Sequence, residues 1–187
     1  VLKGHADELS YERIMELAKE FHTDFDIKGV IIKGGGEPLV KKNTVTSLIN
    51  YLHMQDIRTG IVTNGILLDD ELIEAIVARV SWIRISVDST SPLVYSEMHG
   101  CKSSDFGILL NNISKLVKCR SSVPSSNLVI GVNFSIHDKF NYLEIEHIPE
   151  FSKRLGVDYC TLRYLHPQDS FPFEPERAKI QPLLDRV

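Results

Sequence analysis

Short apolar runs alternate along this chain with longer stretches of helical periodicity, and this alternation constrains the fold more than any other feature of the sequence. Strands are predicted over 28–33, 59–63, 81–87, 128–136 and 158–165. Helices are predicted over 10–21, after Asn43, after Asp69, after Ser104, from Pro149 to Gly156 and from Pro175, with a long connection over 92–104. Their apolar residues recur every three or four positions, as an amphipathic helix requires. Strands that alternate with helices pair in parallel through right-handed crossovers, so the sequence predicts an α/β fold, as an open doubly wound sheet or a barrel.

The order of the elements also suggests how the chain is organised. A helix comes first, which implies a further strand before it, and residue 1 is Val rather than Met. We therefore expect 1–187 to be one domain that is incomplete at its N-terminus, and possibly at its C-terminus as well. A missing first strand would leave an unpaired sheet edge.

Composition excludes several classes of function. The formal net charge of −4 and the scattered basic residues favour neither nucleic acid nor an anionic membrane surface as partner. No apolar run approaches the roughly 20 residues needed to span a bilayer. The three cysteines are widely spaced and form no C-x-x-C pair, so a cytoplasmic protein with reduced thiols is expected.

Polar or glycine residues follow every predicted strand. The first strand is followed by Gly-Gly-Gly-Glu-Pro at 34–38, the second by Thr63 and Asn64, and the third by Ser86 and Asp88. The fourth carries Asn133 and ends near His137, and the fifth carries Arg163 and ends near His166. Ligands of parallel α/β folds bind beyond the carboxyl ends of the strands. The sequence therefore predicts a site for a polar small molecule at that end.

The glycine run at 34–36 allows two interpretations. Glycine lets bare main chain approach a ligand and permits positive φ, and the neighbouring Glu37 is suited to holding an ammonium group. The alternative is a tight turn in which glycine merely relieves crowding. The run is neither a G-x-G-x-x-G dinucleotide motif nor a phosphate-binding P-loop, because the required third glycine and the Gly-Lys-Ser/Thr sequence are missing.

In order, these segments resemble the radical S-adenosylmethionine (radical SAM) family. The family's GGE(P) motif matches 34–38, its T-N-G strand ending matches 63–65, and further matches lie at 85–88, 95–100, 106–113, 131–133 and 163–164. The resemblance implies a partial (β/α)6 barrel of radical SAM type. It also implies an enzyme in which a [4Fe–4S] cluster reduces SAM to methionine and a 5′-deoxyadenosyl radical that abstracts hydrogen from a small-molecule or peptide substrate. An electron donor such as flavodoxin or ferredoxin would supply the reducing electron.

The resemblance assigns cofactor contacts by position. Gly35, Gly36 and Glu37 would hold the amino group of SAM, Asn133 the ribose, and Ser86 and Asp88 the ribose or the methionyl headgroup. Arg163 is assigned to the SAM carboxylate or to substrate, since a guanidinium pairs with a carboxylate through two bonds. The full cofactor-binding set is Gly34, Gly35, Gly36, Glu37, Thr63, Asn64, Ser86, Asp88, Asn133 and Arg163.

The sequence departs from the family in one respect. The C-x3-C-x2-C run that binds the cluster is absent, and Cys101, Cys119 and Cys160 lack its spacing. We therefore expect the first strand and the cluster loop to lie upstream of Val1. Two alternatives stay open: a relative that binds SAM or nothing and lacks radical chemistry, and an aldolase- or lyase-type barrel using Lys33 as its Schiff-base lysine.

Four other residues are assigned structural roles. Trp82 and Cys160 are predicted to be core residues because each lies in or at the start of a strand. His137 and His166 are expected to cap loops or face solvent rather than to contact substrate.

Overall fold

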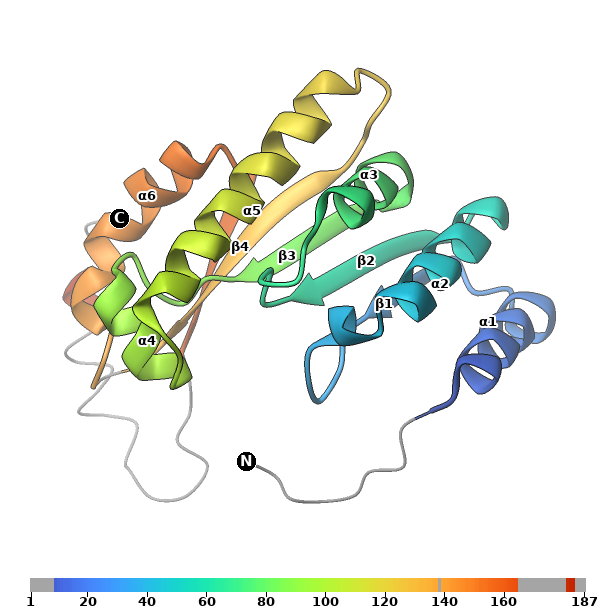
Figure 1. The fold of residues 1–187 in the computed structure, drawn as a ribbon, viewed down its shortest axis with the longest axis horizontal. Coiled ribbons are helices and arrows are strands. Elements are labelled where there is room, and N and C mark those ends of the chain that lie inside the picture. The colour runs from blue at the N-terminus through green and yellow to red at the C-terminus, as the bar shows by residue number, and fades with distance from the viewer. Residues whose placement is uncertain (1–8, 138, 165–180, 184–187) are drawn as a thin grey trace.

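The computed structural model describes residues 9–137, 139–164 and 181–183. In this part of the chain five parallel strands form one open sheet in the order β1-β2-β3-β4-β5. They are β1 (Gly29–Ile32), β2 (Arg58–Thr63), β3 (Trp82–Ser86), β4 (Val129–Ile136) and β5 (Tyr159–Tyr164). The strands run in sequence order across the sheet (Figure 1). This confirms the predicted α/β class and the parallel pairing.

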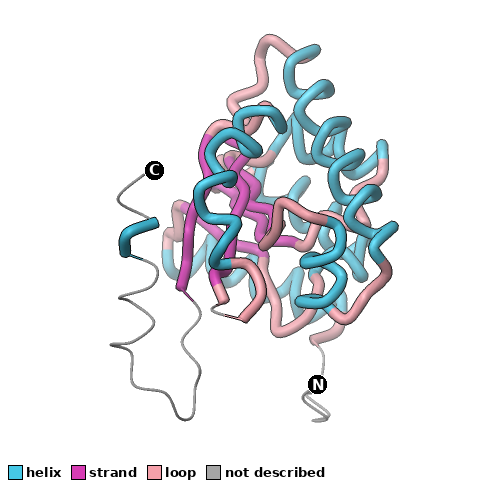
Figure 2. The backbone as a smooth tube through the Cα atoms, turned by 90° about the vertical axis from the view of Figure 1, so that its left-hand side faces the viewer, coloured by secondary structure: helices cyan, strands magenta, loops and turns pink. Residues whose placement is uncertain are grey.

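Helices connect the strands and cover the outer face of the curved sheet (Figures 1 and 2). They are α1 (Tyr11–Phe25), α2 (Lys42–Met54), α3 (Asp70–Arg79), α4 (Pro92–His99), α5 (Ser103–Ser122) and α6 (Ile148–Leu155), with 3-10 turns η1 (Pro38–Lys41) and η2 (Tyr142–His147). Side-chain caps start α1 and α3, where Ser10 and Asp69 accept the main-chain N–H groups of Arg13 and Leu72. Gly156, with φ of 73°, ends α6 as predicted.

Helix α4 corrects the sequence prediction, which expected a long connection over 92–104. Pro92 occupies the first turn and Gly100 ends the helix with φ of 61°. The helix has eight residues, and Tyr95 is its one buried side chain, packed 5.2 Å from the Phe106 ring. A helix this short, with one buried residue, produces almost no apolar periodicity.

The core lies between the helices and the outer face of the sheet. Side chains alternate between the two faces of a strand, and on β3 Ile83 and Ile85 are fully buried under the helices. Trp82, Arg84 and Ser86 point to the opposite, concave face and are half-exposed. The prediction that Trp82 is a core residue is therefore wrong.

Cys160 is also exposed rather than buried, because β5 lies at the edge of the described sheet. The final helix expected from Pro175 falls mostly outside the described residues. Its described part, 181–183, is helical. His166 also lies outside them. No helix in the described ranges is both long and apolar enough to cross a membrane.

Candidate cofactor site

Nine of the ten predicted cofactor-binding residues lie near or just beyond the carboxyl ends of the strands, and Asn133 lies within β4, opposite the last residue of β3. The register of the strands shows which of these residues lie side by side. Ser86 on β3 is opposite Asn133 on β4, and Arg163 on β5 is opposite Ser135, two residues after Asn133. Residues paired in a parallel sheet point to the same face, so Ser86, Asn133 and Arg163 share the concave face. The glycine loop after β1 opens at the same end (Figure 1).

The glycine loop presents bare main chain. A Cβ atom added to Gly35 or Gly36 would meet no atom within 4 Å, whereas one at Gly34 would approach the Gly36 carbonyl oxygen at 3.1 Å. None of the three has φ in the left-handed region. The loop therefore needs glycine at Gly34 for its own close turn, while the space beside Gly35 and Gly36 is open to a ligand.

The Glu37 carboxylate holds this loop against the end of β2. Its Oε1 accepts the Leu39 N–H at 3.0 Å and the Thr63 hydroxyl at 2.7 Å, and its Oε2 accepts the Asn64 N–H at 2.8 Å. Both carboxylate oxygens are thus engaged within the chain. The geometry supports a positioning role for Glu37 more directly than the predicted contact with an ammonium group.

Thr63 and Asn64 are engaged in the same turn. The buried Thr63 hydroxyl donates to Glu37 and accepts the Gly65 N–H at 3.0 Å, and the Asn64 side chain accepts the Ile66 N–H at 3.0 Å. Thr63 is opposite Ile85 in the register and therefore faces the helices rather than the concave side. Thr63 consequently supports the loop and does not face the predicted ligand.

Asn112 is a supporting residue that the sequence did not single out. Its buried side chain on α5 donates to the carbonyls of Gly65 and Ile66 at 2.9 and 3.0 Å. Gly65 has φ of 75° and occupies the turn after β2. Asn112 therefore fixes the turn that carries Asn64, and only its place in the matched 106–113 segment hinted at this role.

Asp88 is buried just beyond β3 in a left-handed conformation, with φ of 59°. Its carboxylate accepts the Ser135 N–H at 2.6 Å and lies 3.5 Å from His99 Nε2. Burial raises the pKa of the Asp88 carboxyl, and the hydrogen bonds from Ser135 and the nearby His99 oppose that rise. The Asp88 carbonyl accepts the buried Asn141 side chain at 2.6 Å.

Asn133 has an unmet hydrogen-bonding capacity. Its Nδ2 donates to the Ser135 hydroxyl at 3.1 Å, but its buried Oδ1 accepts no hydrogen bond from the described residues. A buried polar atom without a partner carries a free-energy cost that a ligand hydroxyl or amine would relieve. Among the side chains at this edge, Asn133 therefore has the clearest need for a hydrogen-bond donor from a ligand.

Arg163 extends this polar edge onto β5, where its side chain is exposed. The positions of Ser86, Asn133 and Arg163 on neighbouring strands give the concave side a hydroxyl, an amide and a guanidinium at one end. His137 has the loop-capping role expected of it: its Nδ1 accepts the Lys139 N–H at 3.1 Å.

The model of the radical SAM superfamily matches residues 2–144 of this sequence. The chain belongs to the radical SAM superfamily. Its curated relatives include the tungsten-containing aldehyde ferredoxin oxidoreductase cofactor-modifying protein of Pyrococcus furiosus, 27% identical over 168 residues that are 88% of this chain and 45% of that protein. They also include a probable GTP 3′,8-cyclase of Archaeoglobus fulgidus, 28% identical over 129 residues, 68% of this chain and 42% of that protein. The chain thus spans less than half the length of these relatives.

Solved structures of radical SAM proteins share the fold. A domain of pyruvate-formate lyase-activating enzyme from Bacteroides vulgatus aligns with a TM-score of 0.63 and 17% identity, covering 84% of this chain and 92% of that chain. Streptococcus suis SuiB bound to S-adenosylmethionine aligns with a TM-score of 0.64 and 15% identity, covering 90% of this chain and 37% of that one. These likenesses confirm the partial radical SAM barrel, and family membership replaces the aldolase-type alternative based on Lys33.

The radical SAM family implies SAM and a [4Fe–4S] cluster, and the described residues differ in how they fit the two groups. Open main chain at Gly35 and Gly36 and the unpaired Oδ1 of Asn133 fit a ligand with amino and hydroxyl groups. For the cluster, no group of three or more His, Cys, Asp or Glu side chains in the described ranges could hold a metal ion. The strand ends therefore suit SAM, but the described residues provide no set of ligands for a cluster.

The three cysteines lie in different parts of the described fold. Cys101 and Cys119 pack against the helix-side core, while Cys160 lies on β5. Burial raises the pKa of the Cys101 thiol, and burial together with Glu74 raises that of Cys119.

Proposed function

We propose that the whole protein is a radical SAM enzyme that binds SAM at the carboxyl ends of these strands and cleaves it reductively. Superfamily membership supports this proposal, and the curated relatives are named as enzymes. When bound, the reduced [4Fe–4S] cluster would supply the electron that generates a 5′-deoxyadenosyl radical from SAM. The protein's own residues would bind the cofactor, orient it and present the substrate.

The observation that carries this proposal is the open main chain at Gly35 and Gly36, held in place by the engaged carboxylate of Glu37. Bare N–H and C=O groups at a strand end are suited to the charged methionyl headgroup, whose amino group would lie against this loop. Glu37, which the sequence predicted as a direct contact, is proposed to set the position of the loop instead.

The other strand ends would bind the rest of SAM. Ser86 and Asn133 are paired in register and face the concave side, where they would meet the ribose hydroxyls. Asp88 is proposed as a second ribose or headgroup contact. Arg163 would pair with the SAM carboxylate or with a substrate, since its guanidinium forms two parallel bonds to a carboxylate.

The remaining parts of the proposal lie outside the described residues. The cluster cysteines are proposed to precede Val1, and an electron donor such as flavodoxin or ferredoxin would act on the cluster. The protein is proposed to work in the cytoplasm on a small-molecule or peptide substrate. Reductive cleavage of SAM would make the protein an oxidoreductase.

The test is anaerobic reconstitution of the full-length protein with iron and sulfide. The proposal expects a brown cluster absorbance and formation of 5′-deoxyadenosine from SAM when dithionite is added. Colourless protein that forms no 5′-deoxyadenosine would instead support a relative without radical chemistry.

A variant pair tests the placement of SAM. Gly36→Val fills the open space beside the loop and should weaken SAM binding at least tenfold by calorimetry, without loss of the fold. Gly107→Val is the matched control, because Gly107 also has open space around it but lies on α5, on the helix side. Equal SAM affinity in the two variants would rule out this cofactor position.

A further inference from the structure

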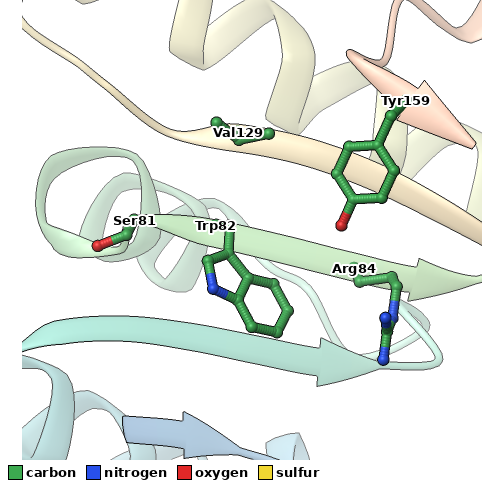
Figure 3. Close-up of a pocket in the computed structure, with 5 residues that line it drawn as sticks. All are labelled: Ser81, Trp82, Arg84, Val129 and Tyr159. Atoms are coloured by element: carbon green, nitrogen blue, oxygen red, sulfur yellow. The ribbon is translucent and has the colours of Figure 1, made fainter. Parts of the chain in front are cut away.

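A pocket of about 330 Å³ lies on the concave face of the sheet, near the amino ends of β3 and β4. Its lining is Ser81, Trp82, Arg84, Val129 and Tyr159, which Figure 3 shows on the same side of the sheet. None of these residues belongs to the proposed cofactor site. The pocket volume lies at the lower end of the range typical of small-molecule sites.

Two glycines let the aromatic rings of the pocket lie across neighbouring strands. A Cβ atom at Gly60 would fall 2.2 Å from the Trp82 ring, and one at Gly131 would fall 2.1 Å from the Tyr159 ring. Each ring therefore covers a glycine of the adjacent strand. In this way β2 and β4 provide the space in which two broad ring surfaces face the inside of the partial barrel.

Arg84 brings a positive charge to this apolar surface. Its guanidinium carbon lies 5.9 Å from the centre of the Trp82 ring, and it has no hydrogen bond or ion pair with any residue in the described ranges. Elsewhere in the chain, the half-buried Arg120 is paired with Asp158. A half-buried guanidinium without a carboxylate favours an anionic group from outside the described residues.

The pocket lies on the same concave face as the proposed cofactor site and one level below it. Arg84 is opposite Gly131 in the register, and Ser86, two residues further along β3, is opposite Asn133. Arg84 is therefore the polar group of the pocket closest along β3 to the proposed SAM site. A ligand seated on Trp82 and Tyr159 would extend toward that site past Arg84.

We propose that this pocket binds the substrate through a planar ring system bearing a carboxylate or phosphate. The ring stacks on Trp82 beside Tyr159, and the anionic group pairs with Arg84. Aromatic stacking and a charge-assisted bidentate bond supply the two halves of this recognition. That the ligand is the substrate rests on the proposed radical SAM function; the binding site itself rests on the geometry of the pocket.

Matched pairs of probes test the site by calorimetry on the full-length protein. Uridine 5′-monophosphate is compared with uridine for a phosphate, and nicotinate with nicotinamide for a carboxylate. At least one anionic probe should bind ten times more tightly than its neutral partner, and the better pair identifies the anion. If neither anionic probe exceeds its neutral partner, or if none of the four binds, the proposal is overturned.

Variants assign the binding to the named residues. Arg84→Gln should abolish the preference for the anion while retaining the affinity for the neutral probe, and Arg84→Lys should retain part of that preference. Trp82→Leu should weaken both members of the pair about tenfold. Arg79→Gln, an exposed arginine at the end of α3, is the control and should change nothing. A preference unchanged in Arg84→Gln would overturn the assignment, and circular dichroism confirms that each variant is folded.

A SAM titration of the same proteins separates this proposal from the proposed function. Gly36→Val should lose SAM affinity but keep the affinity for the anionic probe, and Arg84→Gln should show the reverse. Loss of SAM binding alone would leave the pocket intact as a binding site. Failure of the anionic probes with normal SAM binding would overturn the pocket proposal and leave the proposed function standing.

Discussion

The Oε2 atom of Glu37 accepts the main-chain N–H of Asn64 at 2.8 Å and so joins the glycine loop after β1 to the turn after β2. The same carboxylate accepts the Thr63 hydroxyl at 2.7 Å, so two strand ends share one charged acceptor. A loop made of three glycines has little side-chain packing to fix its shape. The carboxylate therefore supplies the order that the glycines lack.

Replacing Glu37 should lower stability as well as SAM binding. Glu37→Ala removes an acceptor from three donors and should reduce the free energy of unfolding by about 2 kcal/mol or more, because hydrogen bonds to charged groups contribute strongly. Urea unfolding measures the change. Glu97→Ala, an exposed glutamate on α4, should stay within about 0.5 kcal/mol of the parent protein. Equal effects of the two substitutions would contradict the role given to Glu37.

Asp88 should make stability depend on pH in a defined direction. Because burial raises the folded-state pKa of the Asp88 carboxyl, the folded state binds a proton more readily than the unfolded state. The stability from this proton is fully present below the ordinary pKa of 3.8 and is lost as pH rises through the folded-state pKa. Asp88→Asn should therefore gain stability relative to the parent at neutral pH, with the difference shrinking in acid.

The control for Asp88 is Asp56→Asn. Asp56 also has positive φ, at 55°, but its side chain is exposed. This substitution reports the preference of asparagine for left-handed backbone without the effect of burial. Thermal unfolding of both variants across a pH series makes the comparison. A difference between Asp88→Asn and the parent that does not vary with pH would show that burial of the carboxylate is not its cause.

Asn112 should be more sensitive to substitution than its neighbour Asn111. Asn112→Leu leaves the carbonyls of Gly65 and Ile66 without their donor and should cost about 1–3 kcal/mol of unfolding free energy. Asn111→Leu changes an exposed position on the same helix and should be nearly neutral. Chemical unfolding of the pair decides the matter. If Asn112→Leu were as stable as Asn111→Leu, the bonds to the turn would contribute little.

Gly60→Ala should be destabilising only while Trp82 is present. The added methyl group would fall 2.2 Å from the indole ring, so the ring must move, at a cost of about 1–3 kcal/mol. In a Trp82→Ala background the same substitution should lose most of that cost, which a double-mutant cycle measures. Gly107→Ala has open space around its Cβ and lies within α5, so it should stabilise the protein by about 0.5–1 kcal/mol. Additive costs for Gly60 and Trp82 would contradict the contact.

The sequence predicted the five strands, their parallel pairing and the caps at Asp69 and Gly156 because these depend on local pattern. It missed α4, where Pro92 and Gly100 mark the ends of a helix too short to show periodicity. It assigned Trp82 to the core because a strand run alone does not tell the helix-covered face from the concave one. The alternation of Ile83 and Ile85 with Arg84 and Ser86 does distinguish the two faces, and it places Trp82 on the concave face with Arg84 and Ser86.

The candidate site could be predicted only as a set of strand ends. That Gly34–36, Ser86, Asn133 and Arg163 gather at one end follows from parallel pairing. That the carboxylate of Glu37 turns inward to Thr63 and Asn64 depends on contacts 26 and 27 residues away in sequence, which no local pattern records. Asn112 escaped notice for the same reason, since its partners lie 46 and 47 residues away.

The overlap of each aromatic ring with a glycine on the next strand has a consequence for how this barrel can diversify. One nucleotide change at the codon of Gly60 or Gly131 introduces a side chain that displaces the Trp82 or Tyr159 ring and so changes the shape of the pocket. The strand tips, which lie at the opposite end of the same strands, keep their chemistry. The proposed ligand pocket and the proposed cofactor site can therefore change separately within one sheet.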